Sequence, residues 1–486
     1  MKKFKYSVII AFLTLGILAT SSCKKFFDIN SDPDAVLTAP IEQQLSSLTV
    51  NMGFYAGSDV NRYTSLIMQQ FSGQSSGTQN NTQLYEKYLI QGSDENNAWS
   101  SMYATILNDA ENIIKNANET GNPHYSGVAK IIKAYAYQIT VDVWGDIPFS
   151  ETQKLTENTQ PKYDSAESIY TELIKLLDQG IAEVSATTSN KSPGTNSTIY
   201  PGAFATTKAN WIKFANTLKL RIYLHYSEKN AAFAKAQIDQ LINSGVPLFA
   251  SNADNFQMAF VNQAASRNPI DQHETARAGY LVANDKIVTL MNNKLDPRRP
   301  FYFTQYPAGS GLYKGGISGD APSQNYSKLH AYLRGFANNA YTGDAPIRML
   351  TFAEYNFIRA EAALRFNSPG VAQTFFTAGI TASMTDAGVS AANIATYLAA
   401  NGTLVGTTDQ QLSQIITEKY IASYGVIVES WTDWRRTGYP AIAPPANAVV
   451  PYVPRSLYYP QSEIDLNPNA KQKPGLNVRV FWDTRP

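Results

Sequence analysis

The side chains that could do chemistry are few, and their spacing matches no metal site. His124, His225, His273 and His330 are scattered, so they do not form the two-histidine spacing with which a helix binds catalytic zinc. Cys23 is the only cysteine, which is too few for a structural zinc site. We therefore expect neither a zinc site nor a cofactor.

One serine stands in a motif that some hydrolases use. Gly73-Gln-Ser75-Ser-Gly77 fits the G-x-S-x-G pattern, which needs a strand before the serine and a helix after it. The preceding segment, 66–71, is instead helical in pattern, and a loop rich in Thr, Asn and Gln follows. This context favours a polar loop over a catalytic nucleophile.

Acidic residues near the start of the chain match part of a calcium loop. Asp28-Ile-Asn30-Ser-Asp32-Pro-Asp34 spaces its oxygens as such a loop begins, but the glycine of the sharp turn and the closing glutamate are missing. A solvated turn in a tether fits this segment better. Other carboxylates are plentiful, and no pair among them stands out as the acid and nucleophile of a glycosidase.

The start of the chain has the pattern of a lipoprotein export signal. Met1–Lys5 carries three lysines, and 8–18 is an apolar run shorter than the ~20 residues that a membrane span needs. The segment Leu-Ala-Thr-Ser-Ser-Cys that ends at Cys23 resembles a bacterial lipobox. We expect a signal peptide at 1–22 and a lipidated tether at 23–40. Several acyl chains would hold the protein firmly, at about 0.8 kcal/mol per buried CH₂.

The composition predicts a large folded body without a strong field. Of 486 residues, 44% are hydrophobic and 16% charged, which is enough for a core and too few charges for a disordered chain. The formal net charge is +1, whereas a nucleic-acid-binding protein normally has a basic excess. Tyrosines (29) outnumber phenylalanines (22), which favours a binding surface because tyrosine offers both a ring face and a hydroxyl.

Apolar residues recur at helical spacing along most of the chain. Asp164-Ser-Ala-Glu167 is typical of a capping box, and Thr351-Phe-Ala-Glu354 and Thr408-Asp-Gln-Gln411 open two further helices. Other helices are expected at Glu95–Ala117, Gly127–Val143, Trp211–Ile222, Ala232–Asn243 and Val371–Met384. Few segments alternate as strands do, and short strands are expected near Val478–Trp482.

Paired helices with long loops between them predict an all-α fold. Short turns join the helices as in tetratricopeptide-like stacks, although no repeat of fixed period is present. Long loops in compact proteins are usually functional. Such loops, rich in Gly, Pro and Asn, lie at Gly73–Asn81, Ser185–Gly202, Pro300–Gly343 and Tyr439–Pro460. We expect one helical domain over 41–486.

Several segments, in order along the chain, resemble the SusD/RagB family and in particular its SusD-like branch. The most specific of them is Glu429–Pro440, which includes Trp431, Asp433, Arg435 and Arg436. The others are Cys23–Pro33, Asp142–Ser150 with Trp144 and Asp146, Pro161–Asp164, Trp211–Arg221, Asp296–Arg298 and Arg455–Asn467 with Glu463. They run from the anchor to the C-terminus, so the resemblance covers essentially the whole chain.

The resemblance implies a SusD-like fold of tetratricopeptide-like helix pairs, with a loop-rich excursion and no catalysis. The family consists of surface lipoproteins of Bacteroidota that sit on a TonB-dependent, SusC-like outer-membrane transporter and capture oligosaccharides or peptides for it. We therefore expect a nutrient-binding protein that is anchored to the outer membrane and faces the cell exterior. We interpret the shared motif residues as structural, with Asp433 and Arg435 or Arg436 as an ion pair: Trp144, Asp146, Trp431, Asp433, Arg435, Arg436 and Glu463.

A loop-rich region at about 295–345 is the predicted ligand site. Aromatic faces stack on the C–H faces of sugars, and amides and carboxylates bind sugar hydroxyls. Pro300–Gly343 places tyrosines among glycines, which leave rings exposed. The predicted ligand contacts are Tyr302, Tyr306, Tyr313, Asn325, Tyr326, Arg334 and Tyr341.

Three functions fit these patterns. The first is a cell-surface lipoprotein that binds oligosaccharides, and the second is a lipoprotein of the same kind that binds peptides. The third is a helical glycoside hydrolase, which would need two carboxylates about 5–10 Å apart in a cleft. The sequence does not separate a sugar ligand from a peptide.

Overall fold

Helices make up most of the fold, which confirms the all-α prediction. The computed structural model describes residues 39–74, 80–154 and 157–485. The predicted signal peptide, Cys23, the calcium-like segment and Ser75 lie outside these residues. Ile41–Pro486 packs as one unit. Among its described helices, none is both long enough and apolar enough to cross a bilayer.

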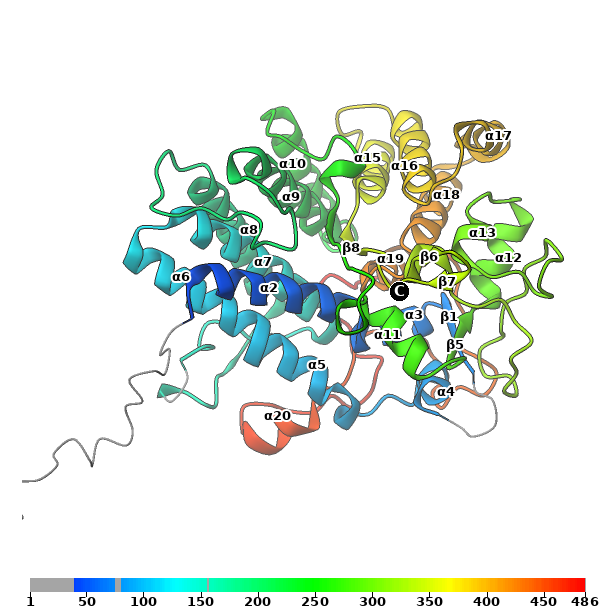
Figure 1. Cartoon of the computed structure of the whole chain (residues 1–486), viewed down its shortest axis with the longest axis horizontal. Helices are drawn as coiled ribbons and strands as arrows, with labels where there is room; N and C mark the ends of the chain where they lie inside the picture. The colour runs from blue at the N-terminus through cyan, green and yellow to red at the C-terminus, as the bar shows by residue number, and fades with distance from the viewer. Residues whose placement is uncertain (1–38, 75–79, 155–156, 486) are drawn as a thin grey trace, which may run out of the picture. The chain divides into compact units, whose positions relative to one another are not determined.

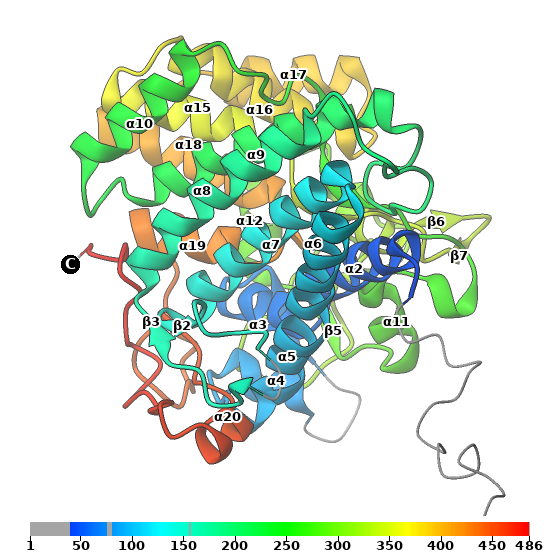
Figure 2. The ribbon, with the colours of Figure 1, turned by 90° about the vertical axis from the view of Figure 1, so that its left-hand side faces the viewer.

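The first half of the chain forms helices that pack side by side. They are α2 (Ile41–Ala56), α3 (Asp59–Ile67), α4 (Asn81–Glu86), α5 (Asn96–Ser100), α6 (Asn108–Thr120), α7 (Pro123–Trp144), α8 (Ala166–Val184), α9 (Phe204–His225) and α10 (Ala231–Asn243), with a π-helical turn at Ser101–Leu107 before α6. From α6 to α10 each helix contacts the next, and Figure 2 shows α8, α9 and α10 as successive neighbours. Short turns between helices produce this arrangement.

The C-terminal helices continue the same stack. They are α15 (Phe352–Phe366), α16 (Ala372–Asp386), α17 (Ala391–Asn401), α18 (Thr408–Ala422), α19 (Glu429–Thr437) and α20 (Gln461–Leu466). Helix α15 contacts α9 and α10 on one side and α16 and α18 on the other. The two halves are therefore one continuous body of packed helices, shown in Figure 1.

The segment between α10 and α15 is the loop-rich excursion. Its elements are β4 (Phe256–Met258), α11 (Pro269–Ala276), β5 (Leu281–Ala283), α12 (Asp285–Asn293), α13 (Arg299–Tyr302), α14 (Ala331–Arg334), β6 (Phe336–Ala337), β7 (Ala340–Tyr341) and β8 (Ile347–Leu350). All its helices are short, and most of the segment is turn and loop. Figure 1 shows its elements in green near α3 and α4.

In the part of the chain that the structure describes, the strands form four antiparallel pairs. Strands β1 (Phe71–Gly73) and β5 pair, β2 (Ile147–Pro148) pairs with β3 (Tyr163–Asp164), β4 pairs with β8, and β6 pairs with β7. The prediction of strands near Val478–Trp482 is wrong, because 478–480 has no regular structure and 481–482 forms a turn. Val480 and Trp482 are both buried and pack into the core as single side chains. Because they are two positions apart, they produce the alternating pattern that predicts a strand.

Two of the three predicted helix starts are displaced by one residue. Ser165, not Asp164, caps α8 by accepting from the amide of Ser168, while the Asp164 carboxylate accepts from Phe149 and Ser150 amides. Thr407, not Thr408, caps α18. Thr351 caps α15 as expected, through the amide of Glu354. The caps are displaced because Ser165 and Thr407, each one position away from the predicted cap, carry a hydroxyl that can accept from a helix amide.

A cluster of buried ion pairs joins the helices α9, α15, α18 and α19. We call it the core ion-pair cluster; it consists of Arg221, Glu354, Glu361, Lys419, Glu429, Asp433 and Arg436. Arg221 donates to both oxygens of Glu354 at 2.7 Å. Lys419 lies 2.8 Å from both Glu429 and Asp433. Every charge in it has a partner, as buried charges require.

The predicted motif residues hold elements in place. Arg436 pairs with Asp433 at 2.9 Å, whereas Arg435 donates to the carbonyls of Asp142 and Arg455 and stacks on Trp431. Trp144 and Trp431 are fully buried and donate to the carbonyls of Tyr458 and Pro454. Asp146 accepts from the first amide of α8 at 2.8 Å, and Glu463 accepts from the Asn467 amide group at 2.8 Å.

Candidate ligand-binding site

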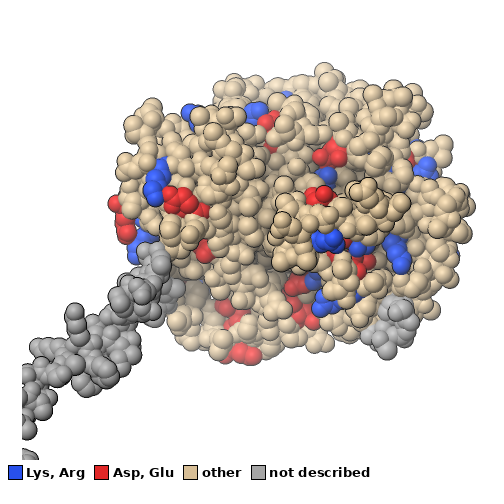
Figure 3. Space-filling model, viewed as in Figure 1, with Lys and Arg blue, Asp and Glu red and all other residues tan. Residues whose placement is uncertain are grey.

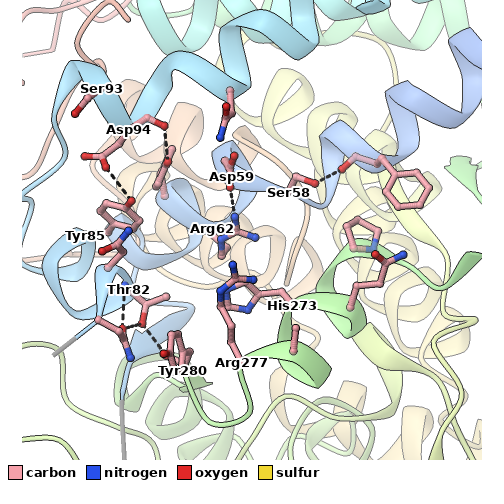
Figure 4. A pocket seen from close by; sticks show the side chains of 18 residues that line it. Ser58, Asp59, Arg62, Thr82, Tyr85, Ser93, Asp94, His273, Arg277 and Tyr280 are labelled. Carbon is pink, nitrogen blue, oxygen red and sulfur yellow. Dashed lines mark hydrogen bonds and ion pairs between the residues drawn. The ribbon is translucent and has the colours of Figure 1, made fainter. Parts of the chain in front are cut away.

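A cavity of about 810 Å³ opens between α3, α4 and α11. Figure 4 shows the side chains that line it, with Asp59 and Arg62 on α3, Tyr85 on α4 and His273 on α11. The size is in the range of sites that bind small molecules and sugars. No group of three metal-binding side chains is present in the described ranges.

The pairing of β1 with β5 brings the two sides of this cavity together. Strand β1 follows α3 and precedes α4, and β5 follows α11 and Tyr280. The carbonyl of Tyr280 accepts from the backbone amide of Gln74 and from the hydroxyl of Thr82, both at 2.8 Å. Residues that are about 200 positions apart in the chain therefore face the same space.

Glu86 also stabilises this junction through hydrogen bonds. Its carboxylate accepts from the Ser72 hydroxyl at 2.9 Å, from the Gly73 amide at 2.8 Å and from the Gly319 amide at 3.0 Å. Burial raises the pKa of Glu86 to about 7, although these three donors act in the opposite direction. The carboxyl group thus links α4, β1 and the excursion.

Helix α11 is held on its buried side, which leaves its other side free to line the cavity. Asn268 caps the helix through the amide of Asp271 and donates to the carbonyls of Leu333 and Ala345. Arg334 donates to the Asp271 carboxylate at 2.8 Å. Gln272, His273 and Arg277 are then presented to the cavity.

Two tyrosines and one aspartate form the end of the cavity at α4. Tyr85 donates to the Asp94 carboxylate at 3.0 Å, and Tyr63 donates to the Asp94 carbonyl at 3.0 Å. Burial, and then the charge of Asp94, raise the pKa of Tyr85 to about 12, so its hydroxyl stays protonated at neutral pH. The rings of Tyr63 and Tyr85 meet edge to face at 4.8 Å. These contacts make this end rigid.

The opposite end carries most of the positive charge. Arg62 forms an ion pair with Asp59 one turn earlier in α3. Burial lowers the pKa of His273 below its ordinary value, and Arg62 and Arg277 add to this while Glu274 opposes it. His273 is therefore neutral at pH 7, beside two permanent cations.

The cavity lining combines the groups that sugar recognition uses. Half-buried Phe54 and Tyr280 supply ring faces. Amide side chains come from Asn80, Asn81, Asn97 and Gln272. A sugar needs both kinds of group, because its C–H face packs on a ring while its hydroxyls exchange hydrogen bonds.

The structure places the predicted tyrosines of the excursion outside the cavity lining. Tyr302 is fully buried between Tyr332 and Tyr424, with ring centroids at 4.5 and 4.9 Å, so its prediction as a ligand contact is corrected to a packing role. The Lys314 ammonium nitrogen lies 5.9 Å from the ring centroid of Tyr306 and 5.1 Å from that of Tyr326. The guanidinium carbon of Arg299 lies 5.4 Å from the ring centroid of Tyr313.

The remaining predicted contacts divide between support and surface. Arg334 is buried and lies 3.6 Å from the ring of Tyr341, so both support α11 and its neighbour α14. Asn325 is exposed in a loop. The adjacent Gln324 donates to the carbonyl of Gly279 at 3.0 Å, next to Tyr280. Gly279 has φ +77°, and a Cβ there would collide with Gln324, so only glycine permits this approach.

Sequence reasoning missed Arg62, His273, Arg277 and Tyr280. His273 and Arg277 are four residues apart, a spacing that places two side chains on one face of a helix. That spacing is a usable signal of a shared helix face, although it does not match a metal site. Nothing in the sequence showed that α11 would face α3.

Comparison with known proteins gives the family. The family model described as "Starch-binding associating with outer membrane" matches residues 29–460. The chain belongs to the SusD-like family. This match confirms the family that the sequence motifs predicted. No curated protein matches the chain.

Solved structures of SusD-like proteins share the fold. One that is described as a chitin-binding protein is 25% identical, with a TM-score of 0.78, and the match covers 92% of this chain and 100% of that one. A SusD homologue from Bacteroides uniformis is 23% identical, with a TM-score of 0.75 over 91% of this chain and 99% of that one. A chitin-binding SusD homologue from Flavobacterium johnsoniae is 22% identical, with a TM-score of 0.74 over 92% and 98%.

Membership of the SusD-like family establishes the general role. SusD-like proteins bind nutrients and do not catalyse a reaction, so the chain is a binding protein and not an enzyme. The description of the family indicates association with the outer membrane. Membership also implies association with a SusC-like transporter. These findings leave the ligand, the anchor and the place of the site to be proposed.

Proposed function

We propose that this SusD-like protein captures oligosaccharides at the cell surface and delivers them to a TonB-dependent transporter, and that the α3–α4–α11 cavity is its ligand site. The observation that supports the site is the lining: ring faces and amide groups surround one open space. The chitin-binding descriptions of two related structures support a sugar as the ligand. The SusD-like family model, which is named for starch binding, does so too.

The rigidity of the cavity also supports the proposal. Its two sides are fixed by the β1–β5 pair, by Glu86 and by the Asn268 cap, so little order has to be created when a ligand binds. A preformed site loses less conformational entropy on binding than a flexible one. Tyr280 is the ring that we expect to stack on the sugar, because it is half-buried and its backbone is fixed on both sides.

A glycan and peptide array tests the ligand. The probe is the soluble form that starts at residue 24, followed by calorimetry on any ligand found. We expect oligosaccharides to bind without turnover, and Tyr280→Ala to weaken binding. Tyr452→Ala is the matched control, since Tyr452 is also half-buried but does not line the cavity. Binding of peptides alone would favour the peptide-capturing alternative, and release of sugar products would contradict a binding role.

The anchor and the partner need tests in cells. We propose that Cys23 is acylated and holds the protein on the outer face of the outer membrane. Replacing Cys23 with Ala should move the protein out of the outer-membrane fraction, and an unchanged distribution would disprove the anchor. Extraction in mild detergent followed by pull-down should recover a large TonB-dependent barrel, whereas recovery of the protein alone under conditions that preserve such complexes would argue against this partner.

A further inference from the structure

Three side chains with cationic or donor character meet at one end of the cavity. Arg62 projects from α3, His273 lies on α11, and Arg277 follows the last residue of that helix. Figure 4 shows the three gathered together, away from Tyr85 and Asp94. The cavity therefore has two chemically different ends.

One of the two guanidinium groups at this end has no ion-pair partner among the described residues. Asp59 pairs with Arg62. Arg277 is exposed, and among residues 39–74, 80–154 and 157–485 its guanidinium has no hydrogen-bond or ion-pair partner. A guanidinium group offers five donors in a planar fork that suits carboxylate and sulfate oxygens.

His273 provides a second observation at the same place. Its side chain is 9% exposed, and its Nδ1 atom is buried without a hydrogen-bond partner; the nearest carboxylate, Glu274, is 3.5 Å away. The pKa of His273 lies below its ordinary value, first because of burial and also because both guanidinium groups act on it. Arg62 and Arg277 are thus both within electrostatic range of the His273 imidazole.

The acids that line the cavity are already engaged. Asp59 is paired with Arg62, and Asp94 accepts from the Tyr85 hydroxyl and from the Gln91 amide at 2.8 Å. Figure 3 shows acidic and basic side chains together on this part of the face, while much of the remaining face is neutral. Arg277 is therefore the cation of the lining for which the described residues provide no acid.

We propose that the Arg62–His273–Arg277 end of the cavity binds an anionic substituent, a carboxylate or a sulfate, so that the ligand is an acidic oligosaccharide. This inference rests on the proposed function and names its substrate class. An anion there would supply the partner that the Arg277 guanidinium lacks among the described residues, beside the Arg62–Asp59 pair. Tyr280, whose ring centroid is 6.4 Å from that of His273, would hold the sugar ring that bears the substituent.

Calorimetry with matched sugars tests the anion. The probes are a galacturonic acid tetramer and its methyl ester, and a sulfated galactose tetramer and its desulfated form. We expect at least one acidic tetramer to bind about tenfold more tightly than its neutral counterpart, since a charge-assisted hydrogen bond contributes more than a neutral one. A preference within the galacturonic acid pair identifies the anion as a carboxylate, and a preference within the galactose pair identifies it as a sulfate. The preference should shrink at high salt, which screens exposed charges.

Arg277→Gln separates the anion from the rest of the site. We expect the variant to lose about tenfold in affinity for the acidic tetramer, with little change for the neutral one. Lys208→Gln is the control, because Lys208 is exposed on α9 and does not line the cavity. Equal affinity for acidic and neutral tetramers, with no effect of Arg277→Gln, would overturn this inference and leave the proposed function intact. Binding of peptides but of no sugar in any of these experiments would overturn both.

Discussion

The core ion-pair cluster and the cavity cluster of Asp59, Arg62, His273 and Arg277 both contain arginines and carboxylates. They differ in how completely these charges are paired. In the core, Arg436 reaches Glu361 and Asp433, and both oxygens of Glu361 accept from it. In the cavity, Arg277 reaches no acid among the described residues. Burial of charge is tolerated only where pairing is complete, whereas an accessible charge can wait for a ligand. Completeness of pairing, not residue type, separates the structural groups from those that we propose bind the ligand.

Removing one arginine from each cluster should give the largest contrast. Arg436→Met removes a buried cation from Glu361 and Asp433, which keep only Arg365 and Lys419 as partners, and we expect a loss of about 3–5 kcal/mol in the free energy of unfolding. Arg277→Met should leave the urea midpoint unchanged, because the side chain is exposed and unpaired. Urea denaturation followed by circular dichroism measures both. Similar losses in the two variants would refute the contrast.

The pH dependence of stability should follow the core cluster. Burial alone would raise the pKa of Glu361, but Arg436 and Arg365 outweigh it and lower the pKa to about 2. A depressed pKa contributes stability above the ordinary value of 4.5, and this contribution disappears as pH falls toward 2. We expect this group alone to account for a loss of about 3 kcal/mol over that interval. Urea midpoints at pH 7, 4.5 and 2.5 measure it.

The control for that prediction is Glu361→Gln. The variant should be less stable than the wild type at pH 7, yet it should lose less stability in acid, because the titrating group is gone. A parallel decline of both proteins between pH 4.5 and 2.5 would mean that other carboxylates dominate the acid response.

Truncation of a cavity ring should affect binding and spare stability. Tyr280→Ala removes the ring that we expect to stack on the ligand, and stacking of this kind contributes about 1–3 kcal/mol per ring in the related case of nucleic-acid bases. Affinity should fall about tenfold or more, because 1.4 kcal/mol corresponds to a factor of ten. Calorimetry measures the affinity, and Tyr452→Ala should leave it unchanged. An equal effect of both substitutions would move the site away from the cavity.

The smallest effect is expected for the tyrosines of the excursion. Tyr306 and Tyr313 do not line the cavity, so Tyr306→Ala and Tyr313→Ala should change affinity less than about threefold. The interpretation of the sequence instead requires about a tenfold loss from each. The same titration therefore decides between the two placements, and a large loss in either variant would return the site to 295–345.

Much of the helical framework could be predicted from the sequence, because its information is local. Apolar spacing and cap residues identified the segments that became α7, α10, α15 and α16, with ends displaced by a few residues. Val478–Trp482 failed for the same reason: its large apolar side chains look like a strand locally, and only the helices around Trp482 show that they are single anchors.

The candidate site could not be predicted, because its information is not local. Arg62 and Arg277 face the same space only through β1 and β5, three residues each, whose pairing no local pattern announces. Tyr302 failed in the opposite direction. Its setting among glycines and polar loop residues indicated exposure, but Tyr332 and Tyr424, the second of them over a hundred positions away, cover its ring.

The β1–β5 pair also has a consequence for how such a protein diversifies. It joins two short segments beside a helical body whose buried charges are paired in the core ion-pair cluster. Substitutions in the cavity, at positions such as Arg62, His273, Arg277 or Tyr280, should therefore change the stability of that body little. Mutations that alter the proposed ligand site are then separated from mutations that destabilise the fold. Descendants of this protein could change their ligand through a few residues beside the β1–β5 pair, while the helical body stays the same.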